Sequence, residues 1–123
     1  MIKSLALALV LITSMEAQAA PVSLWCSGTA ERKIISPATY SDTVSITVDL
    51  ANRTLTLEND GERFPITIGP AHRITVNTRG NWGNTVSILF DRETGKLSIE
   101  IFNDKGQLVW DFTGHCELAR RLS

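Results

Sequence analysis

From residue 44 onward, apolar and polar side chains alternate with a period of two. Val44, Ile46 and Val48 alternate with polar residues, and the pattern returns in each later segment as far as Phe112. Successive side chains of a β-strand point to opposite faces, so this alternation predicts half-buried strands. No segment shows the i, i+3, i+4, i+7 spacing of a helix over three turns. We therefore predict an all-β protein.

The alternation divides the chain into eight predicted strands separated by residues that favour tight turns. Asn59-Asp60-Gly61 and Asn103-Asp104-Lys105-Gly106 tolerate the positive φ of tight hairpins, and Gly95 closes a third turn. Strands joined by such short connections pair as antiparallel neighbours, which predicts an up-and-down meander. The link over residues 29–43 is the exception, because it is long enough to cross one end of the sheet. The expected strands centre on residues 22–28, 44–50, 54–58, 64–68, 74–76, 86–90, 97–101 and 108–112.

The first nineteen residues have the organisation of a secretory signal peptide. Lys3 precedes an apolar run over residues 5–12, and Ala17-Gln18-Ala19 fits the small-x-small cleavage pattern. An eight-residue helix spans only about 12 Å of the roughly 30 Å hydrocarbon core of a membrane. We therefore expect residues 1–19 to be removed, residues 20–123 to form one domain without a membrane span, and the mature protein to be periplasmic or secreted.

The two cysteines lie near the two ends of the predicted domain, Cys26 on the first strand and Cys116 just after the last, and each has the parity of the apolar face. In an oxidising compartment a disulfide between Cys26 and Cys116 is the default, whereas no CxxC spacing or acid/histidine cluster supports a catalytic or metal-binding pair. The Cα atoms of a disulfide usually lie about 4.4–6.8 Å apart, so the first and last strands must be adjacent. An eight-stranded meander whose ends meet is a small, lipocalin-like antiparallel barrel, and a two-sheet sandwich is the alternative.

The interior of such a barrel either fills with side chains or holds one small molecule. Phe64, Phe90, Trp110 and Phe112 all have inward parity, which favours a filled core in a chain this short. No charged residue has inward parity in the predicted strands, so a cavity would suit a fatty acid or another apolar ligand. The outward positions are rich in Ser and Thr, the reverse of the pattern of an outer-membrane barrel.

The charged and catalytic residue types exclude several classes of function. With 12 Lys and Arg against 13 Asp and Glu, the net charge is −1, and there is no basic excess for general nucleic-acid binding. His72 and His115 are the only histidines, and the sequence has no HExxH, GxSxG, P-loop or zinc-ligand spacing. We therefore predict no enzymatic activity, no metal and no cofactor.

The segment over residues 78–84 is the strongest candidate for a partner-binding site. It contains Trp82 at the predicted tip of a glycine-containing loop, together with Arg79, and both residue types are over-represented at binding hot spots. Arg73 and Arg63 add outward positive charge on nearby strands. These four residues would suit an acidic protein or an envelope polysaccharide. Alternatively, Trp82 covers the barrel end and the arginines form a solvated face.

Three segments resemble a known group of proteins. Leu24-Trp25-Cys26-Ser27-Gly28, the run DRETGKL over residues 91–97, and Phe112-Thr113-Gly114-His115-Cys116 look like segments of small exported proteins of alphaproteobacteria, notably rhizobia. That group implies no activity. The layout is also distantly similar to the periplasmic inhibitors of C-type lysozyme, whose SGxxY motif enters the lysozyme cleft and is missing from this sequence.

Three hypotheses of function follow from the sequence. The first is a non-enzymatic binding or interaction module that acts through its loops and outer face. The second is a lipocalin-like carrier of a small apolar ligand inside the barrel. The third is an inhibitor of lysozyme or another hydrolase, which the distant similarity alone suggests.

Overall fold

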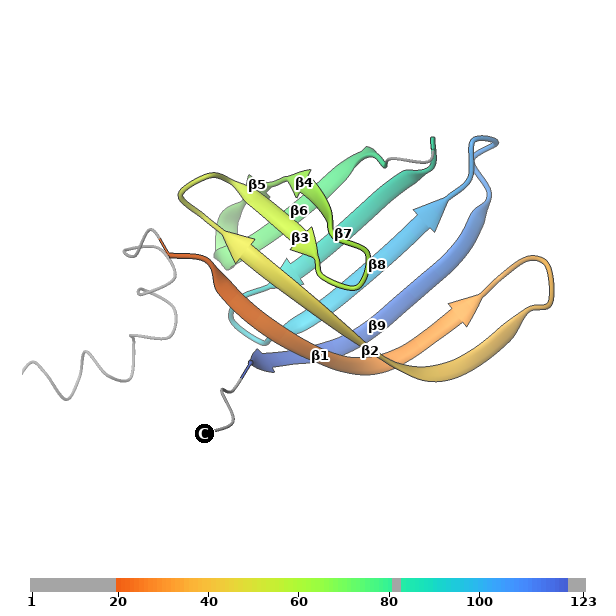
Figure 1. Cartoon of the computed structure of the whole chain (residues 1–123), viewed down its shortest axis with the longest axis horizontal. Helices are drawn as coiled ribbons and strands as arrows, with labels where there is room; N and C mark the ends of the chain where they lie inside the picture. The colour runs from red at the N-terminus through yellow and green to blue at the C-terminus, as the bar shows by residue number, and fades with distance from the viewer. Residues whose placement is uncertain (1–19, 81–82, 120–123) are drawn as a thin grey trace, which may run out of the picture.

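The computed structural model describes residues 20–80 and 83–119, which form one antiparallel sheet (Figure 1). The strands follow the order β4-β3-β2-β1-β9-β8-β7-β6-β5. The two outer members of this order, β4 and β5, are consecutive in sequence, so the sheet curls round until it nearly closes into a barrel. The strands are β1 (Val22–Arg32), β2 (Ala38–Asp49), β3 (Thr54–Leu57), β4 (Glu62–Pro65), β5 (Thr67–Ile68), β6 (Arg73–Arg79), β7 (Thr85–Asp91), β8 (Lys96–Phe102) and β9 (Leu108–Leu118), with a short 3-10 turn, η1 (Pro70–His72), before β6.

The all-β class and the barrel-like antiparallel meander are confirmed, but the predicted count of eight strands is wrong. The strand expected over residues 64–68 is divided into β4 and β5 at Pro65, which has no N–H to donate to a ladder. Directly after this proline, the N–H of Ile66 donates to the carbonyl oxygen of Arg53 at 3.0 Å. β4 therefore pairs with β3, β5 pairs with β6, and the barrel turns a corner at the break.

The link over residues 29–43 is the continuation of two strands and does not cross the sheet. β1 and β2 pair continuously from Val22 opposite Val48 to Arg32 opposite Ala38, which leaves only a short turn. Ala30 on the inward face of this extension is small, and Asp42 is charged, so the aliphatic alternation is absent from the sequence there. The extended β1–β2 hairpin projects at one end of the molecule (Figure 1).

The interior of the barrel is filled by apolar side chains in a single cluster, which includes Phe64, Phe90 and Phe112. Among the described residues, no polar or charged residue is buried. The longer strands contribute alternate residues to this cluster, as the period-two pattern predicts, whereas β4 contributes Phe64 alone. Trp110, the fourth aromatic residue of inward parity, is half-buried and packs against the cluster.

Cys26 and Cys116 form the predicted disulfide. They are directly opposite each other on β1 and β9, with their Cα atoms 3.9 Å apart. Cys26 is fully buried, and Cys116 packs against the core. The bond therefore joins the first and last strands from the inner side of the barrel.

Candidate functional site

One end of the barrel is open. The β1–β2 and β8–β9 connections and the paired ends of β6 and β7 lie toward this end, whereas the start of β1 and the end of β9 lie toward the other (Figure 1). Here the packed core stops below the rim and leaves a pocket of about 240 Å³ between β2 and β3 on one side and β8 and β9 on the other. We call it the mouth pocket. It is lined by Asp42, Thr43, Val44, Leu57, Asn59, Asp60, Ile99, Ile101 and Trp110.

The floor of the mouth pocket is apolar. Val44, Leu57 and Ile99 are buried, and Ile101 and Trp110 are half-buried above them. On β2, the next inward position toward the open end is Asp42 at the rim, so the pocket is the exposed top of the core. A ligand in the pocket would therefore rest on aliphatic side chains and an indole ring.

The orientation of Trp110 is fixed by two neighbours. Its indole Nε1–H donates a hydrogen bond to the hydroxyl oxygen of Tyr40 at 2.9 Å, which joins β9 to β2 over the intervening strand β1. Its ring lies nearly parallel to the ring of Phe112, with a centroid separation of 6.3 Å. Because both contacts are made within the protein, the pocket wall exists before any ligand arrives.

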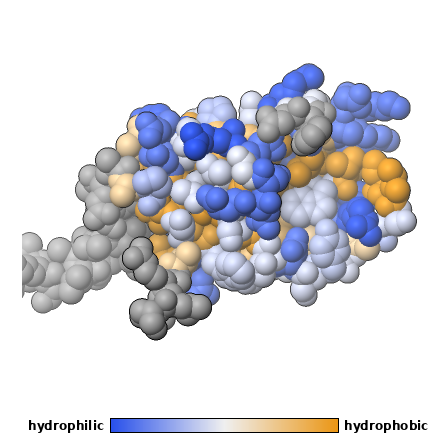
Figure 2. Space-filling view, viewed as in Figure 1, coloured by the Kyte–Doolittle hydropathy of each residue, from blue (hydrophilic) through white to orange (hydrophobic). Residues whose placement is uncertain are grey.

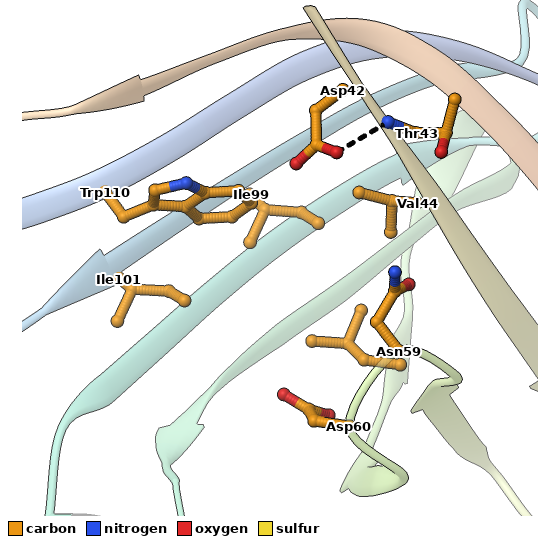
Figure 3. Close-up of a pocket in the computed structure, with 9 residues that line it drawn as sticks. Asp42, Thr43, Val44, Asn59, Asp60, Ile99, Ile101 and Trp110 are labelled. Carbon is orange, nitrogen blue, oxygen red and sulfur yellow. Dashed lines mark hydrogen bonds between the residues drawn. The ribbon is translucent and has the colours of Figure 1, made fainter. Parts of the chain in front are cut away.

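The rim of the mouth pocket is polar and carries two carboxylates from different elements. Asp42 lies in β2 and accepts the backbone N–H of Thr43 at 2.8 Å, and Asp60 lies in the β3–β4 turn and accepts the N–H of Glu62 at 3.0 Å. Figure 3 shows Asp42 and Asp60 on opposite sides of the pocket, with Trp110 to one side in the view. None of the described residues that line the pocket is Lys, Arg or His. Neither carboxylate forms an ion pair within the part of the chain that the structure describes.

The inward charge at the rim corrects the expectation that any cavity would be purely apolar. That expectation placed the start of the second strand at Val44, whereas β2 begins six residues earlier at Ala38. Asp42 has the parity of Val44 and therefore faces inward at the rim. Continuing the alternation two residues back from Val44 would have found it.

The predicted arginines are exposed on the outer surface, where the structure does not gather them into one patch. Arg63 lies in β4 opposite Thr56, whereas Arg73 and Arg79 begin and end β6. Six residues of strand separate the last two by about 20 Å. Arg79 ends β6 within the predicted contact segment, and Trp82 lies outside the described residues.

The charge of a nearby arginine contributes to lowering the pKa of two carboxylates on the outer surface. Backbone N–H groups of the β7–β8 turn, chiefly that of Glu93, lower the pKa of Asp91, and the charge of Arg73 opposite it contributes less. Hydrogen bonds from Asn52 lower the pKa of Asp49, with a smaller contribution from Arg63. The arginine charge is therefore partly matched by neighbouring acids, which weakens the case for a basic patch.

The barrel has no feature of a metal centre in the part that the structure describes. Within residues 20–80 and 83–119, no group of three or more His, Cys, Asp or Glu side chains is arranged to hold a metal ion. The same residues contain no helix of the length and hydropathy that crossing a membrane requires.

Comparison with known proteins gives no match among family models, curated proteins or solved structures.

Proposed function

We propose that this protein is an exported, non-enzymatic binding protein that receives a small group of its partner in the mouth pocket. The observation that carries the proposal is an apolar pocket, rimmed by carboxylates, at one end of a barrel whose buried residues form a single apolar cluster. Pockets that bind ligands are concave and mostly apolar, with a few polar groups that set specificity. At about 240 Å³ the pocket suits a small group better than a whole lipid, so we prefer this function to that of a lipocalin-like carrier.

The tip of the β1–β2 hairpin gives further support for contact with a partner at this end. Ile35 is 84% exposed and has φ +53°, a left-handed conformation that β-branched residues rarely adopt. The tip is tied to β9 because the N–H of Lys33 donates to the carbonyl oxygen of Val109 at 2.9 Å. Figure 2 shows a hydrophobic patch at this end of the molecule, beside hydrophilic side chains. Exposed apolar groups at such a position favour an interface with a partner that covers the rim.

The export part of the proposal rests on the sequence and on the disulfide. Residues 1–19 carry the features of a signal peptide, and a structural disulfide is typical of proteins in oxidising compartments. The described residues offer no constellation of a nucleophile, a base and a metal that would favour catalysis over binding. The proposed partner is therefore a protein or polysaccharide of the cell envelope, or a small molecule carrying the recognised group.

Backbone and indole NMR of the folded protein tests the proposed site with a set of small cationic, anionic and neutral fragments. We expect binding fragments to shift the resonances of Val44, Leu57 and Trp110 more than those of the outer face. Trp110→Phe should weaken this binding, because it removes the indole wall and its hydrogen bond to Tyr40. Trp25→Phe is the matched control, since Trp25 is 47% exposed on the outer face of β1. Fragment shifts confined to the outer face, or no shifts at all, would contradict the proposal.

A further inference from the structure

We infer that the mouth pocket selects an alkylated ammonium group, with a quaternary ammonium as the best fit. This inference rests on the binding function proposed above and adds the chemical class of the recognised group. It follows from three properties of the pocket, which are the charge at its rim, the composition of its floor and the fixed indole in its wall.

The rim sets the sign of the charge. Asp42 and Asp60 contribute carboxylates from opposite sides, and the pocket lining within residues 20–80 and 83–119 includes no cationic side chain. Each carboxylate accepts one backbone hydrogen bond through one oxygen atom, Oδ1. An uncompensated pair of negative charges at the edge of an apolar pocket attracts cations and repels anions.

The floor decides between kinds of cation. A primary ammonium has three N–H donors and needs acceptors for them wherever it is taken out of water. The buried floor consists of the aliphatic side chains of Val44, Leu57 and Ile99, which accept no hydrogen bonds. A quaternary ammonium carries its charge behind methyl groups, which can contact this floor without leaving a donor unsatisfied.

The wall favours the same group. Trp110 is the best aromatic residue for cation–π attraction, and quaternary ammonium ions are ligands commonly recognised in this way. Its Nε1–H is already donated to Tyr40, so the indole offers the ligand ring carbons and not a hydrogen bond. Stacking on Phe112 keeps the ring in place. The indole, the aliphatic floor and the two carboxylates together match a compact cation with an apolar surface.

Divalent metal ions match the site poorly. Hard cations such as Ca²⁺ take six to eight oxygen ligands, whereas the described residues provide no group of three or more metal-binding side chains here. The mouth pocket instead keeps its two carboxylates on opposite sides of an apolar space (Figure 3). An organic cation can fill this space and meet both charges without being chelated.

Three probes of similar size test the inference by NMR titration of the folded protein. Choline is the quaternary ammonium, ethanolamine is the primary ammonium, and 3,3-dimethyl-1-butanol is the uncharged carbon analogue of choline. We expect choline to shift the Trp110 Nε1–H and the amides of Val44 and Leu57, and to bind about tenfold more tightly than either other probe. We also expect the binding of choline to weaken as salt rises from about 0.01 to 1 M, where the screening length falls from about 30 to 3 Å.

Charge-removing variants provide the matched comparison. Asp42→Asn and Asp60→Asn should each weaken choline binding about two- to fivefold and leave the uncharged analogue unaffected. Asp104→Asn is the control, because Asp104 is exposed in the β8–β9 turn at the same end and does not line the pocket.

The outcomes separate this inference from the proposed function. Equal binding of choline and its uncharged analogue at the pocket would overturn the charge selection and leave the binding function standing. Equal binding of choline and ethanolamine would overturn the preference for alkylated nitrogen. If no probe binds while other fragments shift the pocket residues, the inference alone is overturned. If no ligand of any kind shifts them, the proposed function falls as well.

Discussion

Gly28 and Gly114 face each other on β1 and β9, and they allow the two backbones to approach closely beside the disulfide. A Cβ atom on Gly28 would lie 2.0 Å from the carbonyl oxygen of Thr113 and 2.5 Å from the Cα of Gly114. Because backbone atoms cannot move aside cheaply, we expect Gly28→Ala to lower the free energy of unfolding by about 3 kcal/mol, the upper range for overpacked positions. Denaturation in urea measures this change.

Gly69→Ala is the control for this prediction. Gly69 has φ −102°, and a methyl group added there would lie 3.8 Å from its nearest neighbour, the carbonyl oxygen of Arg73. Its substitution should change the free energy of unfolding by less than about 1 kcal/mol. Equal stabilities of the two variants would show that β1 and β9 do not need this close approach.

Asp91 makes stability depend on pH in the acid range. Its Oδ1 accepts the backbone N–H of Glu93 at 2.9 Å and that of Thr94 at 3.3 Å, which lowers its pKa in the folded state. A lowered pKa contributes stability that is present above the unfolded value of about 3.9 and is lost as the pH falls through the folded value. The side chain introduced by Asp91→Asn does not titrate. The Tm of this variant should therefore fall less than that of the wild type between about pH 5 and pH 2. Parallel Tm curves would contradict the assigned role of the turn.

At the scale of the strand, the alternating pattern predicted where most strands lie but not how far β1, β2 and β9 extend. Leu55 and Leu57 mark β3, and Leu97 and Ile99 mark β8, because aliphatic residues appear at every second position. The outer half of β2 carries no such signal, since Asp42 takes an inward position at the open end. The polar rim of the pocket and the extension of the β1–β2 hairpin were missed for one reason. Polar inward residues there interrupt the aliphatic pattern.

The tip of the β1–β2 hairpin provides a prediction at the same scale. Ile35 and Ser36 have φ values of +53° and +61°, and Asn or Gly would adopt this conformation with less strain than Ile. Since Ile35 is 84% exposed, little packing is lost on substitution. We expect Ile35→Asn to raise the free energy of unfolding by about 1 kcal/mol, measured by denaturation in urea.

A conservative variant separates the backbone effect from the side-chain effect at this tip. Ile35→Val keeps the β-branched side chain and its strain, so its stability should equal that of the wild type. If Ile35→Asn proves no more stable than Ile35→Val, the tip does not store backbone strain, and its conformation no longer supports contact between Ile35 and a partner.

For the molecule as a whole, closure of the barrel could be inferred from sequence, but the mouth pocket could not. The inward parity of Cys26 and Cys116 required the first and last strands to be neighbours, and the disulfide joins them. The pocket depends instead on how far each strand continues past the core and on which side chains meet across the open end. Trp110 and Asp42 are 68 positions apart in the sequence and belong to β9 and β2, which are separated by β1 in the sheet. No local pattern could have paired them.

The disulfide yields the last prediction, because it constrains nearly the whole domain. The two cysteines are 90 positions apart, so the bond closes a loop that contains all of β2 to β8. Closing a loop of this length stabilises a protein by about 4–5 kcal/mol in the chain-entropy model, through the reduced entropy of the unfolded chain. We expect a thiol reductant to lower the free energy of unfolding by up to this amount in urea denaturation. The double variant Cys26→Ala/Cys116→Ala should be equally destabilised and insensitive to reductant.

The ladder between β1 and β9 continues from Leu24 to Arg32, so the reduced barrel should stay closed and keep the Trp110 Nε1–H resonance at temperatures and urea concentrations below its unfolding transition. A reduced protein that is as stable as the oxidised one would mean that β-sheet pairing alone holds the ends of the barrel together.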